Sequence, residues 1–188
     1  MALSAQAARE ILKPYEREVK ECIVSAWDEY GKIPFRHKLT PRTRANVVHD
    51  FMVDNARKLE YRPGIRIHEI NGLFIICIKD KLFIRFKKLD EDKLSHSIQT
   101  QQTLEFLGQE ELPRFPVARL IAGYELNSLQ TDLKAVTITY PSGSRNAWHY
   151  DLDSETTVTQ VNPEAAVDET ETNRFLIKSD EDAEAING

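Results

Sequence analysis

Basic and aromatic side chains alternate with apolar ones between Gly64 and Leu89. Arginine and lysine pair well with phosphates and carboxylates, and an aromatic ring among them offers a surface on which a nucleic-acid base can stack. The residues that such a binding site would use are Arg66, His68, Phe83, Arg85, Lys87 and Lys88. These side chains act together only if the backbone brings them to one face, so the local fold decides what they can do.

The stretch predicts a meander of three antiparallel strands. Asn71-Gly72 suits the two positive-φ positions of a type I′ turn, which places Ile70 opposite Leu73. The next connection, residues 79–81, allows a two-residue or a three-residue turn, and the choice decides which side chains share a face.

A two-residue turn would bury Arg85 and Lys87 among isoleucines without an evident partner, which is unfavourable. We therefore expect the three-residue turn, which separates an apolar face from a basic one. The apolar face would hold Ile65, Ile67, Phe74, Ile76, Ile78, Leu82, Ile84 and Phe86. The basic face would hold Arg66, His68, Ile75, Cys77, Phe83, Arg85 and Lys87.

A meander of this size cannot stand alone, because burial of its apolar face does not offset the entropy of ordering it. Two N-terminal helices are expected to cover that face. The first has an apolar stripe from Ile11 to Tyr30 and is interrupted or begun at Pro14, and the second begins with Thr40 as N-cap and Pro41 as first residue.

Further strands are expected at Val117–Leu126, Leu133–Tyr140 and Trp148–Tyr150, and a short helix is expected from Thr100 to Leu107. The predicted fold class is α+β, with the N-terminal helices packed on a mostly antiparallel sheet of five or six strands. Residues 1–152 are predicted to form this single domain, and residues 153–188 an acidic, disordered tail.

A second cluster of cations precedes and opens the second predicted helix, and consists of Arg36, Lys38, Arg42 and Arg44. The positive end of the helix dipole disfavours cations there, so an external anion is one interpretation. A solvated loop whose charges pair with nearby acids or with the tail is the other.

No complete catalytic motif is present: the chain has no Gly-rich phosphate loop, no His/Cys metal spacing and no nucleophile elbow. The order of elements is compatible with a restriction-endonuclease-like core, in which an acid two positions before a lysine helps to hold Mg²⁺. Here Lys87 is preceded at that distance by Arg85, so an active metal-dependent nuclease is disfavoured. A metal-free ribonuclease that uses His68 with these two cations stays open. Asp90-Glu91-Asp92 is interpreted as a turn, and no metal or cofactor is predicted.

Charge is unevenly placed along the chain, whose net charge is -5. From Asp151 onward eleven Asp/Glu face only Arg174 and Lys178, which leaves 23 basic and 19 acidic side chains in residues 1–150. Cys22 and Cys77 lie in apolar patterns, no apolar leader is evident, and no apolar run approaches the ~20 residues that span a bilayer. A cytoplasmic protein without an integral membrane segment is expected.

Several segments resemble one family of small bacterial proteins. They are RHKLTPRTRANVVHDFMV from Arg36, IRFKKLDED from Ile84, TQQ at Thr100, LPRFP at Leu112, AGYELNSL at Ala122 and WHYDL at Trp148. The family is encoded beside a helix-turn-helix protein with an ImmA/IrrE-type zinc-peptidase-like domain, in RosmerTA-type toxin-antitoxin pairs of phage defence. The resemblance covers about residues 36–152. It implies that the peptidase-like protein is the partner and that this chain is the toxin or a toxin-like member.

Three functions follow as hypotheses: a toxin-antitoxin component that acts through binding, a nucleic-acid-binding module, and a degenerate or metal-free nuclease. The alternative without a site is that the acidic tail, or the helix with Glu16, Glu18 and Glu21, covers the basic face.

Overall fold

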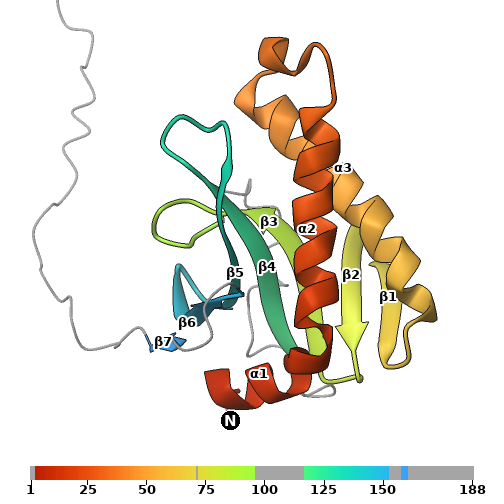
Figure 1. Cartoon of the computed structure of the whole chain (residues 1–188). Helices are drawn as coiled ribbons and strands as arrows, with labels where there is room; N and C mark the ends of the chain where they lie inside the picture. Colours follow the sequence, from red (N-terminus) through yellow and green to blue (C-terminus); the bar gives the residue numbers. More distant parts are fainter. Residues whose placement is uncertain (1–2, 71, 96–116, 153–157, 161–188) are drawn as a thin grey trace, which may run out of the picture.

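The computed structural model describes residues 3–70, 72–95, 117–152 and 158–160. Two helices pack side by side on one face of a twisted sheet, and a short N-terminal helix lies across one end (Figure 1). The predicted α+β class, with helices on a mostly antiparallel sheet, is confirmed.

The helical layer consists of α1 (Ala5–Leu12), α2 (Glu16–Gly31) and α3 (Pro41–Arg57). Pro14 lies in the 3₁₀ turn Lys13–Tyr15 that separates α1 from α2, as a proline that cannot donate its backbone nitrogen requires. The predicted start of the second helix is confirmed, because the Thr40 side chain accepts a hydrogen bond from the Thr43 backbone N–H and Pro41 is the first helical residue. Two further 3₁₀ turns, Arg36–Lys38 and Lys58–Tyr61, flank α3.

The sheet has seven strands in the order β1-β2-β3-β4-β5-β6-β7. They are β1 (Ile65–Ile70), β2 (Leu73–Ile78), β3 (Leu82–Lys88), β4 (Ala118–Leu126), β5 (Leu133–Ser142), β6 (Arg145–Asp151) and β7 (Val158–Gln160). Every neighbouring pair is antiparallel except β3 and β4, which are parallel. The helix expected at Thr100–Leu107 lies outside the described residues.

The register of the meander agrees with both predicted turns. Ile70 lies opposite Leu73, and Ile78 lies opposite Leu82, so residues 79–81 form the three-residue connection. Gly72 has a φ of 77° and Lys79 a φ of 50°, the left-handed conformation that such tight turns need. This register separates the apolar face of the meander from the basic one.

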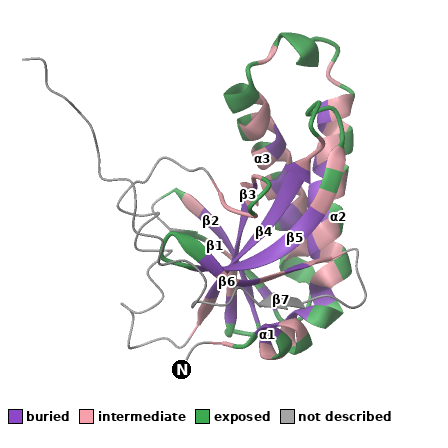
Figure 2. Ribbon diagram, turned by 90° about the vertical axis from the view of Figure 1, so that its left-hand side faces the viewer, coloured by how far each residue is buried: buried purple, intermediate pink, exposed green. Residues whose placement is uncertain are grey.

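The core lies between the helices and the apolar face of the sheet, seen from the side in Figure 2. Ile76, Ile84 and Phe86 of the meander are at most 1% exposed. Fully buried side chains of the helices, Val19, Ile23, Val48 and Met52 among them, belong to the same cluster. This packing supplies the apolar burial that the meander alone lacks.

The C-terminal part of the sheet differs from the expectation in one respect. β6 is not the last strand, because Trp148, His149 and Tyr150 pair with residues 158–160. Three residues of the predicted tail therefore belong to the sheet. The rest of that tail, residues 153–157 and 161–188, lies outside the described residues.

Candidate functional site

The face of the sheet turned away from α2 and α3 holds five of the six residues of the first predicted binding set. We call Arg66, His68, Phe83, Arg85 and Lys87 the basic face; the strand pairing places them on the side opposite the buried Ile84 and Phe86. Lys88 does not belong to it. Side chains alternate along β3, so Lys88 points toward the helices, where it contacts Gln130.

The outer edge of the basic face is tied to the neighbouring turn. Arg66 is exposed and forms an ion pair with Asp80, with its Nη1 3.1 Å from Oδ1. The Cys77 thiol donates to the same carboxylate oxygen at 3.5 Å. His68 and Phe83 meet edge to face, with ring centroids 6.0 Å apart. Arg66 is therefore partly engaged within the protein, whereas the His68–Phe83 pair offers an aromatic contact surface.

The centre of the basic face is buried rather than open. Arg85 is 8% exposed, and burial lowers its pKa from the ordinary value. Ile75 and Cys77 beside it are also buried, at 5% and 2%. Arg85 thus lends positive charge to the face, while most of its own surface is covered.

Arg119 is a member of this face that the sequence analysis missed. It lies on β4 directly beside Phe83 in the parallel ladder and is 6% exposed. The alternation of the predicted strand at residues 117–126 could have placed Arg119 with Ile121 on one side. Only the parallel register of β3 and β4 brings it next to the meander.

Lys87 is the half-buried cation at the inner end of the basic face. It lies beside Gly123 in the ladder, where the Leu89 side chain occupies the space that a Cβ at Gly123 would need. Burial lowers the pKa of Lys87 to about 8, with a further contribution from the charge of Arg85. Among the residues that the structure describes, no carboxylate forms an ion pair with this ammonium group.

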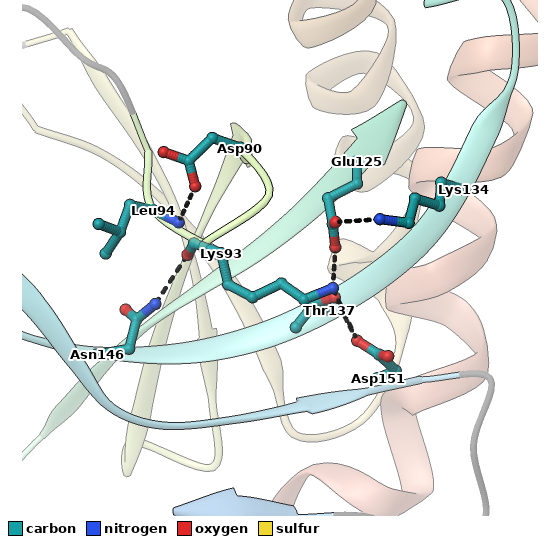
Figure 3. A network of polar contacts seen from close by, with 8 residues as sticks. All are labelled: Asp90, Lys93, Leu94, Glu125, Lys134, Thr137, Asn146 and Asp151. Atoms are coloured by element: carbon teal, nitrogen blue, oxygen red, sulfur yellow. Dashed lines mark hydrogen bonds and ion pairs between the residues drawn. The ribbon is translucent and has the colours of Figure 1, made fainter. Parts of the chain in front are cut away.

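The nearest acid along β4 is engaged elsewhere. Glu125 is 2% exposed, and its carboxylate pairs with Lys93, while its second oxygen lies 3.6 Å from Lys134 Nζ. Lys93 Nζ also lies 3.7 Å from Asp151 Oδ1, so it is held between two carboxylates from β4 and β6 (Figure 3). Glu125 is thus neutralised by two lysines other than Lys87.

His49 of α3 adds a third basic group near the end of β3. Burial lowers the pKa of His49, and the nearby positive charge of Lys87, followed by that of Arg85, adds to the effect. The ladder between β2 and β3 contains only three residue pairs, so the backbone of residues 85–88 is paired with β4 alone. No periodicity in the sequence indicated that the charge of Lys87 would act on His49.

The second predicted set, at the start of α3, does not form one cluster of free cations. The Arg36 guanidinium donates to the Gly31 carbonyl oxygen, which fixes it to the end of α2. Lys38 and Arg42 are exposed. Arg44 donates to Gln130 in the hairpin between β4 and β5. Two of the four cations are therefore used to hold loops, through neutral acceptors instead of the acids that the sequence analysis considered.

The basic face can attract an anion, and Lys87 can pair with one. It holds cations at three depths: exposed Arg66, half-buried Lys87 and buried Arg85. Within the described ranges, no three His, Cys, Asp or Glu side chains come together as a metal-binding group. None of the helices in those ranges is long and apolar enough to cross a membrane.

Comparisons with known proteins assign no family to the chain. No protein-family model, curated protein or solved structure matches the chain.

Proposed function

We propose that this chain is the toxin or a toxin-like component of a bacterial two-gene toxin-antitoxin pair in phage defence. It acts by binding an anionic target through the basic face, and an ImmA/IrrE-type peptidase-like partner neutralises it. The resemblance of residues 36–152 to that family motivates the biological role. The observation that carries the binding mode is Lys87, a half-buried ammonium group for which the described residues provide no carboxylate.

The position of Lys87 has a free-energy cost in the unbound protein. A cation withdrawn from water loses hydration free energy, and a neighbouring cation increases the loss. Lys87 bears both costs, because it is half-buried and lies two residues from Arg85. An anionic group of a target would offset both costs. The free energy gained in this way would contribute to the affinity for that target.

Growth under controlled expression tests the biological role. Induction of this chain alone should slow growth, and co-expression of the neighbouring peptidase-like gene should restore it. If growth is unaffected in both cases, or if the neighbouring protein fails to relieve the arrest, the toxin assignment is wrong.

Nucleic acid is the simplest anionic target to test. With about four phosphate contacts, log affinity for a short RNA or DNA should fall against log salt with a slope of about -3. Lys87→Met should weaken the binding, whereas Lys32→Met, at an exposed lysine after α2 that is not part of the basic face, should leave it unchanged. A salt-independent signal, or the absence of a gel shift at low salt, would eliminate nucleic acid as the target and leave an acidic protein surface.

A degenerate or metal-free nuclease is the second candidate, and the strand arrangement favours it specifically. A three-stranded meander followed by a strand parallel to its third member is compatible with the restriction-endonuclease-like core that the sequence suggested. Arg85 still stands where that core needs an acid. If the nuclease hypothesis is right, wild-type protein cleaves RNA or DNA and Lys87→Ala does not. Absence of cleavage by both proteins removes it.

A further inference from the structure

A second pair of cations meets on the opposite side of the sheet from Lys87. Arg44, in the first turn of α3, donates from Nη1 to the Gln130 carbonyl oxygen at 2.6 Å and from Nη2 to Gln130 Oε1 at 3.2 Å. Lys88, at the end of β3, donates to the same Oε1 at 3.4 Å. Three elements far apart in the sequence, α3, β3 and the β4–β5 hairpin, therefore converge on one neutral side chain.

This convergence leaves two positive charges close together without a carboxylate between them. Burial lowers the pKa of Lys88, and the charge of Arg44 lowers it further. Gln130 can accept their hydrogen bonds but cannot neutralise either charge. It is also one of the few non-glycine residues here with a positive φ, 55°, a conformation that disfavours a side chain. Within the described ranges, neither Arg44 nor Lys88 has an acidic partner.

A hollow of about 360 Å³ opens beside this cation pair. The loop after β3 and the β4–β5 hairpin, which lie next to each other in Figure 1, form its walls. Its volume falls within the range of about 300–1000 Å³ that is usual for sites that bind small molecules. Its apolar lining residues are Ala45, Leu89 and Leu126, and its polar ones are Lys88, Asp90, Glu91, Glu125, Asn127, Ser128 and Gln130.

The polar lining is divided by charge. Lys88 and Gln130, with Arg44 bound to the latter, form the cationic part, and the turn after β3 contributes the acids Asp90 and Glu91, of which Asp90 also accepts from the Leu94 N–H. The cationic part suits an anion, because guanidinium donors match the oxygens of a phosphate in a bidentate fashion. Carboxylates suit the donors of hydroxyl groups. A ligand that fits has an anionic end and a hydroxyl-bearing body.

We propose that this hollow binds a small phosphorylated molecule with hydroxyl groups, such as a sugar phosphate. The phosphate binds Arg44 and Lys88 and takes the place that Gln130 occupies in the free protein. The hydroxyl-bearing body lies against the acidic part. The site shares no residue with the basic face, so this proposal can be right or wrong independently of the proposed function.

Titration calorimetry of the full chain with ribose 5-phosphate tests the assignment, with ribose and inorganic phosphate as matched probes. We expect ribose 5-phosphate to bind at least about tenfold more tightly than either fragment, because only the whole molecule reaches both parts. Failure of ribose 5-phosphate to bind, or equal affinity for one of the fragments, would overturn the proposal.

Three variants locate the binding on the protein. Arg44→Met should weaken ribose 5-phosphate by about tenfold or more, whereas Arg145→Met, at an exposed arginine of β6, should not. Gln130→Gly removes the side-chain acceptor Oε1 shared by Arg44 and Lys88 and keeps the backbone carbonyl, at a position whose φ favours glycine, so its affinity should equal or exceed that of the wild type. Wild-type affinity in Arg44→Met, or a tenfold loss in Gln130→Gly while its circular dichroism stays native, would refute the site.

Discussion

Replacing Lys87 with methionine should make the protein more stable and at the same time weaken its binding of an anionic target. Methionine keeps much of the length of the side chain but removes the charge that burial penalises. In the folded protein the pKa of Lys87 falls from 10.5 to about 8. Full conversion of that difference would correspond to about 3 kcal/mol, but the side chain keeps contact with water, so screening reduces the expected gain to about 1–2 kcal/mol.

Thermal or urea unfolding at pH 7 measures this gain, with Lys32→Met as the control that should match the wild type. For a protein of this size, each kcal/mol raises the midpoint of thermal unfolding by about 2–4 °C. The size of the gain depends on pH: between about 8 and 10.5 the folded wild type binds fewer protons than the unfolded chain, so its stability rises with pH and the advantage of the variant shrinks. A variant that is less stable than wild type at pH 7 would show that Lys87 has a stabilising partner in the folded protein, contrary to this prediction.

Three further predictions concern pH and packing. Affinity for an anionic target should fall by about tenfold from pH 7 to pH 9 as Lys87 loses its proton, and Lys87→Arg should abolish this dependence in a fluorescence titration; an unchanged slope in the variant would assign the titration to another group. Gly123→Ala should destabilise by about 1–3 kcal/mol in urea unfolding, because the new Cβ would lie 2.3 Å from Leu89 Cγ; a neutral result would mean that Leu89 moves freely. Glu125→Ala should cost about 3 kcal/mol by the same measurement, since it leaves the Lys93 ammonium poorly neutralised, and a loss below about 1 kcal/mol would contradict that role.

Turn chemistry and the cost of burying charge together explain why the meander could be predicted with its register. Asn71-Gly72 suits one kind of turn, whereas residues 79–81 allow two, and the unfavourable burial of Arg85 and Lys87 among isoleucines decided between them. The N-cap of α3 was predictable from local chemistry alone, because Thr40 and Pro41 act on backbone groups within one turn.

Contacts between distant parts of the chain could not be read from the sequence. Alternation in β4 does not reveal whether the strand runs parallel to β3, and that direction brings Arg119 beside Phe83. Arg44 and Gln130 are 86 positions apart, and no local pattern links them. β7 was not predicted, because three residues in an acidic stretch carry too weak a strand signal.

Burial of charge was the feature of the site hardest to foresee. The sequence distinguishes a basic from an apolar face, but it does not show that Arg85 is covered while Arg66 is exposed. Lys87 and Lys88 are neighbours in the sequence, yet they belong to opposite faces and to two different proposed sites.

Growth arrest by matched variants shows whether toxicity depends on the basic face. The wild type, Lys87→Met and Lys32→Met would be induced at equal levels of folded protein, and the growth rate measured. We expect the wild type and Lys32→Met to slow growth and Lys87→Met to leave it normal. Equal arrest by both variants would show that toxicity does not depend on the basic face, and the proposed binding mode would then be wrong.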